Sequence, residues 1–168
     1  MDNIKGILFD KDGTLIEFFS LWEKIALGLV ADLANGEDPL FQQELLASIG
    51  LVNGQITANS ILAGGTTKDI ADAFYPLLLK ESCQIPEPFH QWVEKRILQL
   101  TKDHLQVIQP ITDLKKLLKQ LKDDGLKLGV ATADDQETTT LTFQMLGIDH
   151  YFDFIGTSDH YEKNRTQI

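Results

Sequence analysis

The sequence contains little cysteine and no long apolar run. Cys83 is the only cysteine among the 168 residues, so an intrachain disulfide and a cysteine-based metal site are both excluded. No segment is long and apolar enough to span a membrane, and residues 1–5 lead directly into a short apolar run rather than into a secretion signal. We therefore expect a cytoplasmic protein.

Positive charge is also scarce. The chain has 15 Lys and Arg residues against 25 Asp and Glu residues, which makes its formal net charge −10. Nucleic acids and anionic membranes both favour basic surfaces, so neither is an expected partner. A small phosphorylated metabolite remains compatible with this charge, because a bound cation and backbone N–H groups dominate the field inside a small pocket.

Several common catalytic motifs are missing. There is no His-Glu-x-x-His zinc motif and no Gly-x-Gly-x-x-Gly dinucleotide motif, and the glycine-rich stretch at 64–68 lacks the order of a Walker A loop. The hydrophobic content of 43% and the charged content of 24% are those of an ordinary globular protein. The length suits one or two small domains.

Two carboxylates near the N-terminus are the most informative feature that is present. Asp10 and Asp12 follow an apolar run that is too short for a helix and shows no polar alternation, which predicts a strand buried on both faces, as in a parallel α/β sheet. Side chains two apart on extended backbone point the same way, so both carboxylates should face one site at the carboxyl end of the strand, whereas Lys11 should point elsewhere. Gly13 then permits a tight turn. An acidic turn without catalytic function is the alternative.

The pattern along the chain predicts a sheet domain interrupted after its first strand. Residues 17–106 are mostly helical, with apolar residues at helical spacing in blocks such as 41–49, 70–79 and 89–105. A helix over 111–122, a strand over 126–131, a helix ending before Gly147 and a short strand near 152–156 follow. We therefore expect a Rossmann-like α/β core over 1–16 and 107–168, with an inserted all-α domain over 17–106.

A second group of polar residues follows the strand at 126–131. Thr132 ends this strand, and Ala133 and Asp134 begin a turn whose backbone N–H groups suit a phosphate oxygen. Thr is common at strand ends, and Asp134 or Asp135 is equally suited to capping the next helix.

Together these segments resemble the haloacid dehalogenase-like hydrolase superfamily, in particular its phosphoglycolate phosphatase and phosphomutase-like members with a helical cap. The first family motif, Asp-x-Asp-Gly-Thr after an apolar strand, is complete at 10–14. The resemblance implies that Asp10 attacks phosphorus to form an aspartyl-phosphate and that Asp12 is the general acid and base. It also implies that Asp10 and the backbone carbonyl of Asp12 hold Mg²⁺, and that Gly13, Thr132 and Ala133 lie near the phosphate. The helical insert would then be the cap that selects the substrate.

The family pattern continues with a lysine and a fourth strand that ends in an acidic pair, and the sequence does not contain this strand. Lys163 lies near the expected lysine, and Asp159 is a candidate replacement metal ligand, although both suit ordinary surface positions. The core is therefore expected to lack its last strands, which would expose the edge of the first strand. We expect self-association, or rearranged local segments, to cover that edge.

The leading hypothesis is an Mg²⁺-dependent phosphatase that hydrolyses a small phosphorylated metabolite. Two alternatives stay open. One is a phosphomutase of the same family, which would use the same residues. The other is a shortened, catalytically impaired protein with a binding or oligomeric role.

Overall fold

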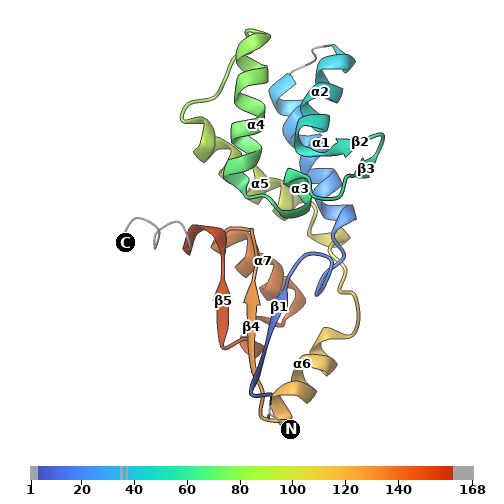
Figure 1. Ribbon diagram of the computed structural model, residues 1–168, viewed down its shortest axis with the longest axis vertical. Coiled ribbons are helices and arrows are strands. Elements are labelled where there is room, and N and C mark those ends of the chain that lie inside the picture. Colours follow the sequence, from blue (N-terminus) through green and yellow to red (C-terminus); the bar gives the residue numbers. More distant parts are fainter. Residues whose placement is uncertain (1–3, 35, 37, 161–168) are drawn as a thin grey trace. The chain divides into compact units, whose positions relative to one another are not determined.

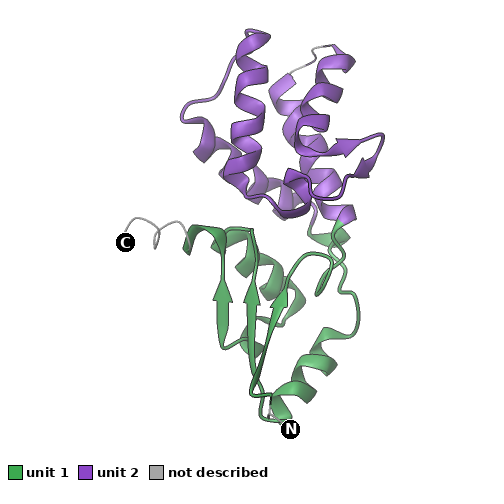
Figure 2. Cartoon of the chain, in the orientation of Figure 1, with its two compact units in different colours: residues 1–18, 105–168 green, residues 19–104 purple. Residues whose placement is uncertain are grey.

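The computed structural model describes residues 4–34, 36 and 38–160. The chain divides into two compact units, unit 1 over residues 1–18 and 105–168 and unit 2 over residues 19–104 (Figure 2). Unit 1 contains β1 (Gly6–Asp10), η1 (Leu105–Val107), α6 (Leu114–Asp123), β4 (Lys127–Ala131), α7 (Gln136–Leu146), η2 (Asp149–Tyr151) and β5 (Phe154–Gly156). Unit 2 contains α1 (Phe19–Ala34), α2 (Pro39–Ile49), β2 (Leu51–Val52), β3 (Gln55–Ile56), α3 (Ile61–Gly64), α4 (Thr67–Lys80) and α5 (Phe89–Asp103).

Unit 1 is built on a parallel sheet in the order β1-β4-β5 (Figure 1). Helix α6 precedes β4, and helix α7 connects β4 to β5, so both are crossover helices of the kind that parallel strands require. The apolar core includes Leu118 of α6, Val130 of β4 and Phe143 of α7, all of which are fully buried. The predicted α/β class with a parallel sheet is therefore confirmed.

Strand β1 corrects one detail of the prediction. Its residues alternate between exposed and half-buried, and Leu8 is 63% exposed, so the strand is not buried on both faces. The reason is its place in the sheet: β1 pairs with β4 on one side and is an edge strand among the described residues. Leu8 is in register with Gly129 and, through it, with Phe154, which is also exposed. Self-association through this edge stays a prediction.

Helix α6 begins later than its apolar pattern predicts because Asp113 caps it. The Asp113 carboxylate accepts the backbone N–H of Lys116 at 3.1 Å, which sets the start at Leu114. The residues before it pair with the first loop instead. Ile111 donates its N–H to the carbonyl of Leu15 at 3.0 Å, and Pro110 forms a bridge with Ile16.

Unit 2 is a group of helices packed on their apolar faces. The core includes Leu29 of α1, Leu45 of α2, Phe74 of α4 and Val93 of α5, each of them fully buried. The prediction of an all-α insert is not fully correct, because the unit also contains the short antiparallel hairpin β2–β3. The sequence does contain a signal for it, because Asn53 and Gly54 both have positive φ, at 50° and 70°, and Asn-Gly favours tight hairpin turns. No helix in the described ranges is long and apolar enough to cross a membrane.

Candidate active site

Asp10 is the last residue of β1 and presents an exposed carboxylate at the carboxyl end of the strand. Within residues 4–160, apart from the undescribed 35 and 37, no side chain or N–H group donates a hydrogen bond to this carboxylate, and no cation pairs with it. An acidic side chain at the carboxyl end of a parallel strand lies where α/β proteins bind their ligands. Asp10 is thus available for chemistry or for a cation.

The chain turns sharply directly after β1. The carbonyl of Lys11 accepts the backbone N–H groups of Leu15 at 2.9 Å and Ile16 at 3.1 Å, and Gly13 donates its N–H to the carbonyl of Ile16 at 2.8 Å. Gly13 has φ +78°, a conformation that glycine adopts without strain. Leu15 and Ile16 are fully buried and fix this turn to the core. The tight turn predicted at Gly13 is therefore present.

Lys11 is buried in this turn and has two carboxylate partners. Only 1% of its side chain is exposed, and its ammonium lies 2.8 Å from Asp12 and 2.7 Å from Asp134. The prediction that Lys11 points away from the site is therefore wrong. Strand β1 ends at Asp10, and the bend that follows ends the strict alternation of side chains on which that prediction depends. A fully buried lysine is almost always paired, but its position between two aspartates gives no sign in the sequence that Lys11 is buried.

The neighbouring charges shift the pKa values of Lys11 and Asp12. Burial acts to lower the pKa of Lys11, but the negative charges of Asp134 and Asp12 hold it above its ordinary value. Burial raises the pKa of Asp12 to about 6; Lys11 acts in the opposite direction, while Asp134 and Asp10 add to the rise. The contribution from Asp10 means that the two motif carboxylates are close enough to repel each other. A carboxyl with a pKa near 6 exchanges protons readily near neutral pH.

The end of β4 lies beside the end of β1. Asp10 is in register with Ala131, so the next residue, Thr132, begins a loop next to the β1 turn. Thr132 is 9% exposed, donates its N–H to the carbonyl of Gly156 at 3.0 Å, and accepts the N–H of Asp134 on its hydroxyl at 3.2 Å. The hydroxyl proton is not used in that bond and can still be donated. The half-buried Ala133 lies between these two residues.

Asp134 and Asp135 have different roles, although either was suited to capping the next helix. Asp135 is the N-cap of α7 and accepts the N–H of Thr138 at 2.8 Å and its hydroxyl at 3.0 Å. Asp134 instead pairs with Lys11 and so joins the β4 loop to the β1 turn. The sequence pattern did not single out Asp134 as a partner of Lys11.

Asp159 and Lys163 complete the set of candidate residues. The Asp159 carboxylate accepts the Thr157 hydroxyl at 2.6 Å and the N–H of Gln136 at 3.2 Å. Partial burial acts to raise the pKa of Asp159, but these hydrogen bonds hold it below its ordinary value. Its Oδ1 atom thus already has structural partners at the start of α7. Lys163 lies outside the described residues.

The donors at the end of β1 are chemically suitable for Mg²⁺. This ion prefers hard oxygen ligands and retains several waters, so one free carboxylate and one backbone carbonyl form an adequate partial shell. Asp10 supplies such a carboxylate. The carboxylate of Asp12 is engaged by Lys11, so the backbone carbonyl of Asp12 is the group of this residue that could bind the ion. Across the described residues, no three His, Cys, Asp or Glu side chains gather into a metal cluster.

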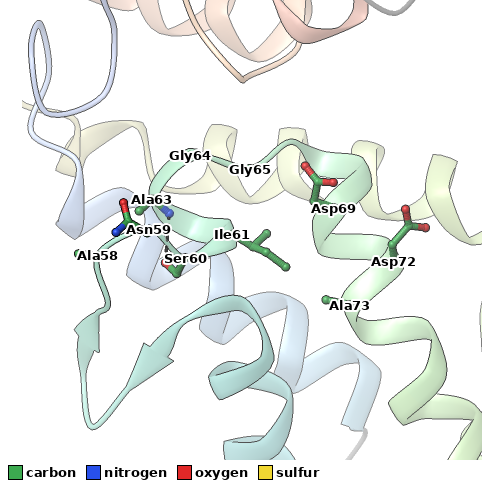
Figure 3. A pocket seen from close by; sticks show the side chains of 10 residues that line it. All are labelled: Ala58, Asn59, Ser60, Ile61, Ala63, Gly64, Gly65, Asp69, Asp72 and Ala73. Carbon is green, nitrogen blue, oxygen red and sulfur yellow. Dashed lines mark hydrogen bonds between the residues drawn. The ribbon is translucent and has the colours of Figure 1, made fainter.

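Unit 2 has a pocket of its own, open to solvent, with a volume of about 1000 Å³ (Figure 3). Asn59, Ser60, Asp69 and Asp72 are among the residues that line it. Two of its carboxylates are already engaged within the unit: Asp69 accepts the N–H of Thr66 at 2.7 Å, and Asp72 pairs with His90 at 2.8 Å. Its polar groups thus mainly stabilise the helices around it.

The model of the haloacid dehalogenase-like hydrolase family matches residues 7–167, so the chain belongs to this family. No curated protein matches the chain in sequence.

Solved structures share the fold at low sequence identity. A predicted phosphoglycolate phosphatase from Haemophilus somnus 129PT is 17% identical, with a TM-score of 0.58 over 92% of this chain and 63% of its own. CbbY from Rhodobacter sphaeroides, solved with xylulose 1,5-bisphosphate, is 18% identical, with a TM-score of 0.59 over 94% and 64%. The HAD hydrolase YfnB from Bacillus subtilis, solved with magnesium, is 17% identical, with a TM-score of 0.55 over 95% and 67%. The chain thus spans about two thirds of their length.

Proposed function

We propose that this protein is an Mg²⁺-dependent phosphatase that acts on a small phosphorylated metabolite through an aspartyl-phosphate. The observation that carries the proposal is the pair of carboxylates at the end of β1. Asp10 is exposed and unpaired among the described residues, whereas Asp12 is held by Lys11 and has a pKa raised to about 6. Two carboxyls in different environments suit the two roles of nucleophile and acid–base.

The reaction has two steps. In the first, a carboxylate oxygen of Asp10 attacks phosphorus, the bond from phosphorus to the ester oxygen breaks, and Asp12 donates a proton so that the leaving group departs as an alcohol. In the second, Asp12 takes a proton from water, which attacks the aspartyl-phosphate and releases inorganic phosphate. Asp10 is then a free carboxylate again, and Asp12 is again protonated.

Thr132 and the residues around it would bind the phosphoryl group. Its hydroxyl proton is available for a phosphate oxygen, and the N–H of Ala133, which has no acceptor among the described residues, adds a donor. The N–H of Gly13 already donates to the carbonyl of Ile16, so this glycine would contribute the shape of the turn. The Asp10 carboxylate and the Asp12 carbonyl would hold Mg²⁺, with Asp159 as a further candidate. The ion supplies positive charge that offsets the charges of the phosphate and Asp10. Lys163 is a candidate for a second cation.

Unit 2 is proposed as the cap that selects the substrate. An insertion between the first two strands of a sheet domain can exclude water and contact the part of the substrate beyond the phosphate. CbbY binds a sugar bisphosphate, which supports a substrate of this general size.

The test is hydrolysis of 4-nitrophenyl phosphate with and without Mg²⁺. We expect metal-dependent turnover that is abolished by Asp10→Asn and by a chelator. Asp124→Asn, which makes the same change at the exposed end of α6, is the matched control and should retain the wild-type rate. Turnover that survives Asp10→Asn would overturn the aspartyl-phosphate mechanism. A folded wild-type chain with no turnover would favour an impaired member of the family, and transfer of phosphate within a sugar phosphate would favour a mutase.

A further inference from the structure

Lys11 lies between two carboxylates from different parts of the chain. Its ammonium is 2.8 Å from Asp12 in the β1 turn and 2.7 Å from Asp134 in the β4 loop. It also donates a hydrogen bond to the second oxygen of Asp12 at 2.9 Å, so both oxygens of that carboxylate are within reach of the same cation. One side chain thus fixes the orientation of the Asp12 carboxylate and connects the two loops of the site.

We infer that Lys11 is a positioning residue, which holds the acid–base carboxylate of Asp12 in place for proton transfer by pairing with Asp12 and Asp134 together. This inference rests on the proposed function. Lys11 is 1% exposed, so it cannot contact a substrate and must act through Asp12. Asp12 is 17% exposed and keeps access to a ligand, whereas Asp134 is 9% exposed and serves as the inner anchor.

The physical case depends on what else orients the Asp12 carboxylate. The turn fixes the backbone, but apart from Lys11 no side chain or N–H group among the described residues donates a hydrogen bond to this carboxylate. General acid catalysis requires the proton donor to be within hydrogen-bond distance of the leaving oxygen, so a carboxylate that rotates between rotamers is less effective. A buried ion pair with two anchors limits this rotation.

The inference predicts an effect that depends on the leaving group. An alkyl phosphate needs a proton on its departing oxygen, whereas 4-nitrophenyl phosphate releases a stable phenolate and needs little help from an acid. The value of kcat/KM reports the steps up to departure of the leaving group, so the second half of the reaction does not obscure the comparison. A purely structural role for Lys11 would lower both values by the same factor.

The experiment compares glycerol 2-phosphate with 4-nitrophenyl phosphate for Lys11→Met, at saturating Mg²⁺ and with thermal unfolding as a check on folding. We expect kcat/KM to fall about 100-fold on the alkyl phosphate, at the lower end of the range for general acid catalysis, and less than tenfold on the aryl phosphate. Lys127→Met is the matched control, because Lys127 is 77% exposed and, among the described residues, pairs only with the surface residue Asp153 at 3.0 Å. It should leave both values unchanged.

A second variant keeps the test decisive if Lys11→Met does not fold. Asp134→Asn retains the pair between Lys11 and Asp12 but removes the charge of the inner anchor, and we expect about a tenfold fall on the alkyl phosphate alone. Equal losses on both substrates, in whichever variant folds, would overturn the positioning role while leaving the proposed function standing. No turnover of either substrate by the wild-type chain would instead overturn the proposed function, and this inference with it.

Discussion

Replacing Thr132 with valine removes the two hydrogen bonds that its hydroxyl can make but preserves the shape of the side chain. Valine has nearly the same volume and branching, so the end of β4 keeps its packing. The hydroxyl accepts the N–H of Asp134 at 3.2 Å, which leaves its proton free for a phosphate oxygen. Thr132→Val removes both bonds, whereas Thr132→Ser keeps both and loses only a methyl group.

The expected magnitudes follow from the surroundings of the hydroxyl. Thr132 and Asp134 are both buried, so the N–H of Asp134 loses its acceptor away from water, which costs about 1–3 kcal/mol of unfolding free energy. A hydrogen bond to a charged phosphate is worth about 1.5–3 kcal/mol, which corresponds to a fall in kcat/KM of about 10- to 150-fold. For Thr132→Ser we expect a fall of no more than about threefold, because its hydrogen bonds persist.

The assay is kcat/KM for 4-nitrophenyl phosphate at saturating Mg²⁺, together with chemical denaturation and inhibition by inorganic phosphate. Inhibition by phosphate should weaken in parallel with kcat/KM, because both depend on the same donor. Equal kcat/KM values for the valine and serine variants would refute the phosphate role of Thr132. Equal unfolding free energies would refute the structural role of its bond to Asp134.

Two further predictions concern stability. Gly28 of α1 lies against Leu100 of α5, and a Cβ at this glycine would lie 2.6 Å from a Leu100 methyl. We expect Gly28→Ala to cost about 1 kcal/mol, because overpacking of about 1–3 kcal/mol exceeds the gain in helix propensity of about 1 kcal/mol. Leu100→Ala should be less harmful in the Gly28→Ala background than alone; additive effects in chemical denaturation would contradict this packing. The second prediction concerns Asp153, where hydrogen bonds from Lys122, the N–H of Leu128 and Lys127 hold the pKa of the carboxyl well below its ordinary value. A lowered pKa stabilises the folded chain above the unfolded pKa of about 3.9 and loses this effect as the pH falls below it. Asp153→Asn should therefore lower Tm at pH 7, with a difference that shrinks below about pH 4; a difference independent of pH would exclude the charge effect.

The comparison between sequence and structure is clearest at Lys11. Its neighbours Asp10, Asp12 and Gly13 are recognisable in the sequence, because a short apolar strand, two carboxylates and a glycine turn depend on adjacent residues. The partner Asp134 follows a different strand, and only the parallel pairing of β1 with β4 brings it to 2.7 Å from Lys11. Local patterns contain no information about such a contact.

The burial of β1 illustrates the same limit. The apolar run correctly predicts a parallel strand, but the number of strands beside it determines which residues are covered. With β1 at the edge of the three-stranded sheet that the structure describes, Leu8 is 63% exposed, although its sequence suits an interior position.

The sequence by itself determined the class of fold, the two carboxylates and the turn that follows them, because strand period, residue chemistry and glycine geometry are local properties. Only the tertiary structure decided that Lys11 is buried between Asp12 and Asp134, that Asp135 rather than Asp134 caps α7, and that β1 lies at the edge. Each of these depends on pairing between segments far apart in the chain, which sets the distances between charges and the exposure of side chains.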